Sequence, residues 1–333
     1  MSLPAKQYTA SWLDRLWYQG HKAFWLLLPV SWLYGVITAA RRLLFRIGLK
    51  RRYKLDVPVI VVGNISVGGT GKTPFTLLLC QLLRQHGWTP GIVSRGYGAS
   101  ITAPILLTEH STATQVGDEP LLLAKRSGCP VVVCPNRVAA AQFLLAQTNT
   151  DIIISDDGLQ HYALARDIEI VLIDGKRGLG NGQLLPAGPL RERSWRLKQA
   201  ALVLANSQPF ALAEGVMQLA VSGTKPLIGQ AELTTKRVTL VAGIGNPQRF
   251  ADTAKAAGFS IVGAHFFADH HNFTPADFNA ISGPVLMTEK DAVKCRQFAK
   301  PDWFSLAVEA SLDQHSLTKL TTLITELRSR YGT

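Results

Sequence analysis

The chain has few acidic residues. Its 333 residues include 23 Asp and Glu against 35 Lys and Arg, so the formal net charge is +12. Cysteine is scarcer still, with four residues, no Cys-x-x-Cys pair and no Cys/His cluster at zinc spacing. This excludes a disulfide framework, and we expect the cysteines to be small buried side chains in a reducing compartment. The excess of positive charge indicates an anionic partner, which is a nucleic acid, an acidic lipid or a phosphorylated substrate.

Glycine and proline, with 28 and 17 residues, are not abundant enough for a collagen-like or low-complexity chain. Charged residues make up 17 % and hydrophobic residues 47 % of the chain. These proportions exclude a disordered protein and are ample for a sizeable core. At roughly 150 residues per domain, the length predicts about two domains.

The most apolar stretch is AFWLLLPVSWLYGVITAA, residues 23–40, which contains no charge. As a helix it would be about 27 Å long, against a bilayer core of about 30 Å, and Pro29 would kink it. The segment before it mixes tryptophan and leucine with charged residues, as interfacial helices do. The segment is therefore expected to associate with a membrane, either as a single span or as a helix that lies in the interface. A buried core helix is the alternative.

A basic collar follows this apolar run. Residues 41–54, RRLLFRIGLKRRYK, contain seven basic and no acidic residues. Each basic group near an anionic leaflet contributes roughly 1 kcal/mol of attraction. We therefore expect residues 1–56 to form a membrane anchor, peripheral or with one N-terminal span, that leaves the remainder cytoplasmic. Nucleic acid is not expected as a partner, because the basic residues cluster beside an apolar segment and no nucleic-acid motif is recognisable.

A phosphate-binding loop is predicted at residues 63–74, GNISVGGTGKTP, between a buried strand over 57–62 and a helix over 75–87. Glycines let backbone N–H groups turn toward phosphate oxygens, and the helix N-terminus adds partial positive charge. Lys72 can reach the β- and γ-phosphates, and Thr73 offers a hydroxyl to Mg²⁺. Ser66 stands where the common P-loop pattern has its first glycine. The residues expected to bind nucleotide are Ser66, Val67, Gly68, Gly69, Thr70, Gly71, Lys72 and Thr73.

A pair of carboxylates follows the strand-like segment DIIIS at residues 151–155. Asp156 and Asp157 would stand at the carboxyl end of a strand beside the P-loop strand, which is where such folds hold Mg²⁺. A surface turn is the alternative. No Asn-Lys-x-Asp guanine motif is present, because residues 204–207 read LANS. ATP is therefore the expected nucleotide, with Mg²⁺ as the metal.

Further strand-like and helical segments alternate along the chain, which predicts an α/β fold with a doubly wound, mostly parallel sheet. We expect a P-loop nucleotide-binding core over 57–235 and a smaller C-terminal α/β lobe over 236–333. The strands expected in the core, besides those named above, are 91–94, 131–134, 168–173 and 201–205. In the lobe we expect strands over 238–242, 260–264, 285–288 and 304–308 and helices over 248–258 and 317–331.

Three arginines follow predicted strands or sit in a loop of the core: Arg95, Arg137 and Arg191. Ligands bind at the carboxyl ends of strands in open α/β sheets, and arginine holds phosphate groups in a bidentate manner. Each arginine alone is more typical of an ordinary surface residue. Together with the P-loop they predict that at least one binds an anion.

The order of the motifs resembles the tetraacyldisaccharide 4'-kinase family over nearly the whole chain. The motifs are GNISVGGTGKTP, SRGYG (94–98), GDEP (117–120), SDDGLQH (155–161), LPAGPLRE (185–192) and DHHNF (269–273). The alternative is a membrane-docked P-loop ATPase switch that acts with a protein partner. Such ATPases read K-G-G-x-G-K-T, and Val67 stands here in place of the first lysine.

The resemblance implies transfer of the γ-phosphate of ATP to the 4'-hydroxyl of an acylated glucosamine disaccharide 1-phosphate, giving lipid IVA in lipid A biosynthesis. It implies action on the cytoplasmic face of the inner membrane of a Gram-negative bacterium, with no protein partner required. Asp118 would be the catalytic base or would only orient the hydroxyl, and His270 would assist it, with His271 as the alternative. The family motifs also place the following residues in the substrate or nucleotide cleft: Arg95, Arg137, His161, Arg191 and Glu192.

On the residues alone, Asp118-Glu119-Pro120 is typical of a helix start, since acidic side chains favour the first turn and proline its first position. His270 and His271 are predicted to lie in a loop just before a helix that starts near Thr274 and Pro275. If His270 meets Asp118, the active site lies between the two lobes. Closure of the lobes would then exclude water from ATP.

Overall fold

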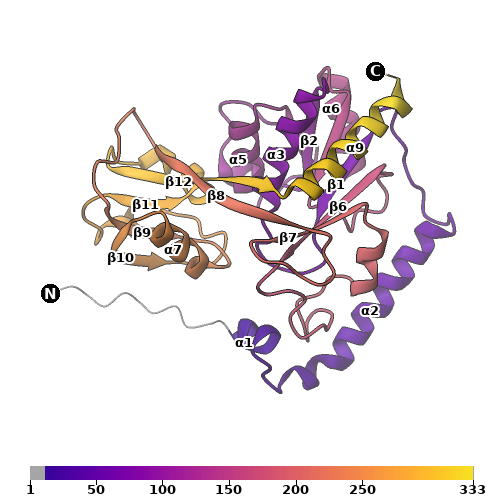
Figure 1. Cartoon of the computed structure of the whole chain (residues 1–333), viewed down its shortest axis with the longest axis horizontal. Helices are drawn as coiled ribbons and strands as arrows, with labels where there is room; N and C mark the ends of the chain where they lie inside the picture. Colours follow the sequence, from indigo (N-terminus) through magenta and orange to yellow (C-terminus); the bar gives the residue numbers. More distant parts are fainter. Residues whose placement is uncertain (1–11, 333) are drawn as a thin grey trace.

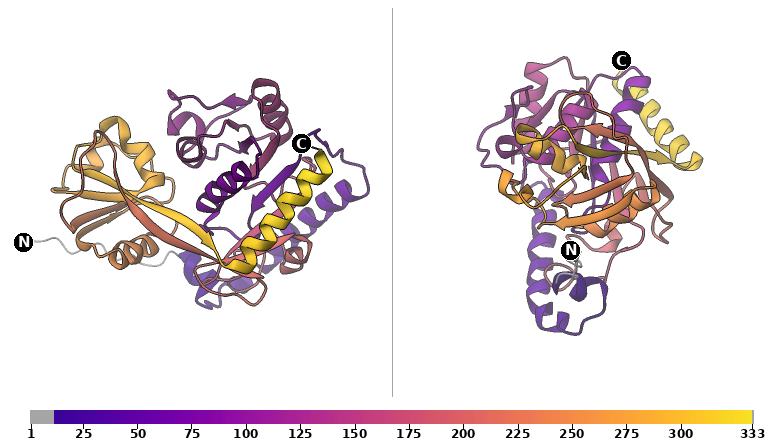
Figure 2. Two further views of the ribbon diagram at one scale, coloured as in Figure 1. Left: turned by 45° about the horizontal axis from the view of Figure 1, so that its top comes forward. Right: turned by 90° about the vertical axis from the view of Figure 1, so that its left-hand side faces the viewer.

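The computed structural model describes residues 12–332, so the first eleven residues of the predicted anchor lie outside the described part. Two helices open it, α1 (Trp12–Tyr18) and α2 (Phe24–Arg46). Both lie along one side of the molecule, and α2 runs along the outside of the core that contains the predicted P-loop (Figures 1 and 2).

One twelve-stranded sheet runs through the described chain in the order β10-β9-β11-β12-β8-β7-β6-β1-β5-β2-β4-β3. Neighbouring strands are parallel except for the pairs β3–β4 and β8–β12. This confirms the predicted α/β fold with a mostly parallel sheet. The strands are β1 (Val59–Gly63), β2 (Pro90–Ser94), β3 (Ile105–Leu106), β4 (Val131–Val133), β5 (Ile152–Asp156), β6 (Ile168–Asp174), β7 (Leu202–Asn206), β8 (Gly215–Pro226), β9 (Arg237–Ala242), β10 (Ser260–Phe266), β11 (Val285–Thr288) and β12 (Trp303–Leu312).

Helices cover the sheet and connect its strands. In the core they are α3 (Lys72–Gln85), α4 (Ala113–Val116), α5 (Asp118–Ser127) and α6 (Arg137–Gln147). Farther along the chain they are α7 (Pro247–Ala256), α8 (Glu289–Cys295) and α9 (Gln314–Tyr331). Short 3-10 turns span Ser194–Gln199, Pro275–Phe278 and Arg296–Phe298.

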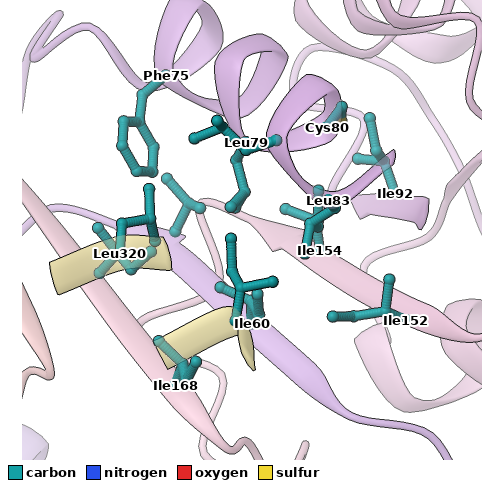
Figure 3. Close-up of a cluster of buried hydrophobic side chains, with 14 of the residues drawn as sticks. Ile60, Phe75, Leu79, Cys80, Leu83, Ile92, Ile152, Ile154, Ile168 and Leu320 are labelled. Atoms are coloured by element: carbon teal, nitrogen blue, oxygen red, sulfur yellow. The ribbon is translucent and has the colours of Figure 1, made fainter. Parts of the chain in front are cut away.

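The main hydrophobic core lies between α3, the central strands and α9. Strand β1 is buried along its whole length because helices cover both faces of the parallel sheet, and its sequence VIVVG is accordingly apolar. Phe75 and Leu79 of α3 meet Ile60 of β1 and Leu320 of α9 in one cluster (Figure 3). The C-terminal helix therefore packs on the P-loop core, although it follows the last strand of the smaller lobe.

The two lobes are connected through the antiparallel pair of β8 and β12. Strand β8 also pairs with β7 of the core, and β12 also pairs with β11 of the smaller lobe. The sheet is thus continuous from one lobe to the other, and Figure 2 shows the pair crossing between them. The proposed domain limits of 57–235 and 236–333 separate these two paired strands, and we keep them as a proposal about sequence segments.

Helix α2 presents an apolar face outward. It is long and apolar enough to cross a membrane by length and composition, yet a single helix of this kind is weak evidence of a span. Only 6 % of its most apolar 18-residue window is buried, which argues against the alternative of a core helix. Its buried side is held by Ser31, whose hydroxyl donates to the Leu184 carbonyl and accepts from the Ala187 N–H, both at 2.9 Å.

The packing of α9 on the core gives a stability prediction. Leu320→Ala removes a fully buried side chain and should lower the free energy of unfolding by about 2–5 kcal/mol. Thr322→Ala, on the exposed side of the same helix, should change it by less than about 0.5 kcal/mol. Urea unfolding followed by circular dichroism measures both. Equal effects of the two substitutions would show that α9 does not contribute its own buried face to the core.

Candidate active site

The predicted P-loop lies between β1 and α3. Helix α3 begins at Lys72, three residues before the predicted start at residue 75, because Gly71 adopts a left-handed φ of 91° and turns the chain into the helix. The backbone N–H groups of Lys72 and Thr73 therefore belong to the helix N-terminus. On its other side, the loop is tied to the segment 184–192 by the Val67 N–H, which donates to the Pro189 carbonyl at 2.8 Å.

Asn206, at the end of β7, holds this loop in place through a buried hydrogen bond. Its side-chain amide donates to the Thr70 carbonyl at 3.0 Å, and the residue is 1 % exposed. A Cβ at Gly71 would lie 2.5 Å from that amide nitrogen and 2.7 Å from the Met217 Cε atom. Sequence reasoning weighed Asn206 only as part of an absent guanine motif and missed this role, which depends on the pairing of distant strands.

The carboxylate of Asp157 lies close to two cations, Lys72 and Arg191. Its Oδ1 atom lies 3.7 Å from the Lys72 Nζ atom, and both of its oxygens lie 3.1 Å from the Arg191 Nη1 atom. Burial acts to raise the pKa of Asp157, but the charges of Lys72 and Arg191 outweigh it and hold the pKa below its usual range. The structure thus brings together Lys72 and Asp157, which were predicted for the nucleotide and the metal, with Arg191, which was predicted for the substrate or nucleotide cleft.

Asp156 is buried beside this pair, at the end of β5. Its Oδ2 atom lies 3.4 Å from the Ser94 hydroxyl, while its Oδ1 atom has no hydrogen-bond partner. Burial, helped by the charge of Glu119, raises the pKa of Asp156 to about 7. A buried carboxylate oxygen without a partner is costly unless a proton or a cation reaches it.

The predicted helix start at Asp118 is observed: α5 begins there, directly after Gly117, which has φ 90°. Asp118 is 5 % exposed, and its Oδ2 atom lies 3.1 Å from the Nδ1 atom of His270. His270 comes from the loop after β10 in the smaller lobe, and its own φ of 59° is uncommon for a residue other than glycine. The two residues therefore meet across the contact between the lobes.

His271 points elsewhere. Its Nε2 atom lies 3.2 Å from the Asp277 Oδ2 atom, and its ring stacks on Phe267. Asp277 belongs to the capping box with Thr274 that opens the expected helix, here a 3-10 turn of four residues. Of the two histidines that sequence reasoning left open, the geometry thus joins His270 to Asp118.

Lys290, in α8, completes the cluster around Asp118. Its Nζ atom lies 3.2 Å from the Glu119 Oε1 atom, 3.4 Å from the His270 Nε2 atom and 3.9 Å from the Asp118 Oδ2 atom. Lys294, one turn later, lies 3.7 Å from the same Asp118 oxygen. Sequence reasoning missed both lysines. The available signal was the charged sequence EKDAVK directly after the predicted strand 285–288, since polar groups at strand ends gather at one edge of a parallel sheet.

These contacts fix the charge state of the cluster. Burial acts to raise the pKa of Asp118, but the hydrogen bond from His270 and the charge of Lys290 outweigh it and lower the pKa. Burial likewise acts to lower the pKa of Lys290, but Glu119 and Asp118 outweigh it and raise the pKa. Because an ammonium group has only donors, Lys290 donates to His270 Nε2, so the imidazole proton sits on Nδ1 and is donated to Asp118.

The remaining predicted residues are placed differently. Arg95 is exposed after β2. Arg137 is 3 % exposed, donates to the carbonyls of Cys134 and Asp156, and has its pKa lowered by burial to about 10. His161 accepts from the Arg137 N–H at 3.3 Å, and burial lowers its pKa to about 4. Arg137 thus joins the ends of β4 and β5 through its hydrogen bonds.

Glu192 is also buried, at 3 % exposure. It accepts from the Tyr162 hydroxyl at 2.6 Å, from Gln160 at 2.9 Å and from Arg42 of α2 at 3.3 Å. Its observed contacts tie α2 to the core.

Among the described residues, no cluster of three or more His, Cys, Asp or Glu side chains is arranged to hold a metal ion.

Comparisons with known proteins agree with this geometry. A family model described as tetraacyldisaccharide-1-P 4'-kinase matches residues 23–325. The chain is 51 % identical over 317 residues to the tetraacyldisaccharide 4'-kinase of Shewanella sp. (strain MR-7), covering 92 % of this chain and 95 % of that protein. It is 49 % identical over 322 residues to the protein of the same name from Shewanella baltica (strain OS185), with coverages of 92 % and 94 %.

A solved structure is similar as well. It is the "apo" form of LpxK from Aquifex aeolicus in complex with ATP, which superposes with a TM-score of 0.78 at 29 % sequence identity. The match covers 91 % of this chain and 99 % of that one. The similarity therefore extends over both lobes.

The role of Lys290 in the cluster gives a prediction about the pKa of Asp118. In Lys290→Met that pKa should rise, because one opposite charge within about 4–6 Å of the carboxylate is lost. Lys290→Arg keeps the charge and should leave the pKa closer to its original value. A pH titration followed by ¹³C NMR of the aspartate carboxyl carbons measures it, with Asp118→Asn identifying the signal. An unchanged pKa in Lys290→Met would contradict the proposed coupling.

Proposed function

The chain belongs to the tetraacyldisaccharide 4'-kinase family, and we propose that two sets of its residues divide the reaction between them. The reaction is transfer of the γ-phosphate of ATP to the 4'-hydroxyl of a tetraacyldisaccharide 1-phosphate in lipid A biosynthesis. One set, around Lys72, holds ATP. The other, around Asp118, acts on the acceptor hydroxyl. The observation that carries the proposal is the 3.1 Å contact between Asp118 Oδ2 and His270 Nδ1.

The loop residues 66–73 would hold the phosphates through backbone N–H groups and the N-terminus of α3. Lys72 is paired with Asp157 at 3.7 Å, and Arg191 with the same carboxylate at 3.1 Å. Both cations can turn from Asp157 to phosphate oxygens when the nucleotide binds. Asp157 therefore keeps the two cations ordered before the nucleotide binds.

The residues present fit a Mg²⁺ ion. The unpartnered Oδ1 atom of Asp156 offers a buried carboxylate ligand, and Asp157 and Thr73 lie at the same edge of the sheet. Mg²⁺ is usually bound by one or two carboxylates together with substrate phosphates, so a dedicated protein cage is not needed. When bound, the ion neutralises charge on the transferring phosphate.

Asp118 would act on the acceptor hydroxyl. His270 donates to it through Nδ1, and the backbone N–H of Glu119 donates to its other oxygen at 2.8 Å. A carboxylate accepts up to about four hydrogen bonds, so a site for the hydroxyl proton is left. Because its pKa is lowered, Asp118 is a weak base. We infer that it orients the hydroxyl and takes its proton late, as a loose transition state allows.

His270 and Lys290 are positioning residues in this scheme. His270 fixes the orientation of the Asp118 carboxylate, and Lys290 fixes the tautomer of His270. Asp118 and Glu119 come from the core, while His270 and Lys290 come from the smaller lobe. Contact between the lobes is therefore required for the cluster to form, and their closure over ATP would exclude water.

We further propose that α1 and α2 dock the enzyme on the cytoplasmic face of the bacterial inner membrane, either in the interface or as one span. The supporting observation is the exposed apolar side of α2, which includes Trp25, Leu26 and Trp32. The basic collar at 41–54 would face anionic headgroups. Membership of the family decides against the ATPase switch, and we propose that transfer needs no protein partner.

The purified protein should therefore transfer ³²P from γ-labelled ATP to the disaccharide 1-phosphate in detergent micelles. Asp118→Asn should lower kcat by about 10²–10⁴-fold, the range for a residue that handles the transferred proton. Lys72→Ala should abolish labelling, because the phosphates lose their principal cation. His270→Gln should lower kcat, with retained binding of ATP.

The matched control is His271→Gln, which changes the neighbouring histidine that pairs with Asp277. It should retain activity within about tenfold of the wild type, the effect of losing one net hydrogen bond. Failure of the wild-type protein to label the lipid would refute the proposed division of labour together with the kinase activity. Full activity of Asp118→Asn would refute the proposed role of Asp118 but would leave the kinase activity standing.

A further inference from the structure

A large groove lies between the C-terminal half of α2 and the core, away from the site described above. Its volume is about 1090 Å³. One wall is α2, with Val36, Leu43 and Arg46. The other includes Trp195 and Leu164, and Arg52 from the segment after α2 completes the rim.

The groove is at the opposite edge of the sheet from the P-loop. Strands β1 and β6 are parallel, with Val62 beside Ile170. The P-loop follows the end of β1, whereas the groove is lined by residues 164–167 and 169, around the start of β6. A ligand in the groove would therefore lie beyond the reach of the nucleotide loop and of Asp118.

The groove carries a surplus of positive charge. Its two carboxylates are engaged: Glu169 pairs with Arg166 and Arg196, and Asp167 accepts from the Val59 N–H and the Tyr331 hydroxyl. Arg42 pairs with Glu192 and covers the Trp195 ring at 4.3 Å.

Two further arginines of the groove remain available. Arg46 and Arg52 are exposed and have no carboxylate partner within the described chain. The two guanidinium groups line one groove, where both can donate hydrogen bonds to a phosphate group.

The groove also has an apolar wall that continues onto the outer face of α2. Val36 is 65 % exposed and Leu43 54 % exposed, and both line the groove. Leu164 and the alanines at 165, 200 and 201 form part of the other side. Figure 1 shows α2 extending along the outside of the core. A ligand that matches the groove has an anionic head and a hydrocarbon chain.

We infer that this groove binds one anionic glycerophospholipid of the bilayer, with its phosphate between Arg46 and Arg52 and one acyl chain along Val36 and Leu43. The inference rests on the proposed docking of α2 at the membrane, to which it adds one specifically bound lipid. The lipid would hold α2 at a fixed depth and rotation. A general attraction of the basic collar to anionic leaflets would not do so.

The test compares two double variants that remove the same charge from the same collar. Arg46→Gln/Arg52→Gln removes the two free arginines of the groove. Lys50→Gln/Arg51→Gln removes two basic residues that do not line it and lie over the rings of Phe45 and Tyr53. Binding of the full-length protein to short-chain phosphatidylglycerol in detergent micelles is measured, with phosphatidylcholine as the neutral lipid. Sedimentation with vesicles of the same two headgroups gives the membrane affinity.

The groove variant should bind phosphatidylglycerol at least about tenfold more weakly than the collar variant, as the loss of hydrogen bonds to a charged phosphate implies. Equal losses in the two variants would overturn the inference and leave only general electrostatic attraction. Unchanged binding in both would overturn it as well.

Kinase activity on the disaccharide 1-phosphate in detergent without phospholipid separates the inference from the proposed function. Both variants should retain the kcat and KM of the wild type within about twofold, because the groove lies away from the site. A raised KM for the disaccharide in the groove variant alone would show that the groove belongs to the substrate and overturn the phospholipid assignment. A wild-type protein without kinase activity would contradict the proposed function, whatever the lipid binding.

Discussion

The antiparallel pairing of β8 with β12 is the interaction on which the rest of the site depends. These strands run from Gly215 to Pro226 and from Trp303 to Leu312, and they are paired over nearly their whole length. Because β8 also pairs with the core and β12 with the smaller lobe, one hydrogen-bonded sheet connects the two lobes. The loop that carries His270 and the helix that carries Lys290 are thereby brought to the start of α5. The ion pair of Arg126 in α5 with Glu289 in α8 adds a second tie at the same contact.

Two clusters of opposite charges result, each with at least one ion pair at its centre. On the nucleotide side, Lys72 and Arg191 share the carboxylate of Asp157. On the acceptor side, Asp118 and Glu119 share the ammonium group of Lys290. Charges held in this way stay ordered in a partly buried site, where an unpaired charge would be costly. The exposed apolar side of α2 then allows a lipid acceptor and a water-soluble nucleotide to be handled by one molecule.

Local patterns in the sequence predicted much of this arrangement. The strand, glycine loop and helix around Lys72 follow one another along the chain, so their sequence was enough to predict the P-loop. The helix start at Asp118 was likewise evident from an acidic pair before proline. Strand β8 was not predicted, because its residues alternate between partly buried and exposed and its antiparallel partner β12 lies about 80–95 residues farther along the chain. The burial of Arg137 and Glu192 could not be predicted, since it depends on tertiary packing. The sequence could not decide between His270 and His271, because the choice depends on the positive φ of His270 and on the contact of His271 with the capping residue Asp277.

The central claim is that Asp118 and His270 act as one unit across the contact between the lobes. A double-mutant cycle on kcat for phosphate transfer tests it directly, with Asp118→Asn, His270→Gln and the combined variant. Residues that act as a unit are strongly non-additive, so the combined variant should be about as slow as Asp118→Asn alone. Losses that multiply in the combined variant would show that the two residues act independently and would contradict the account.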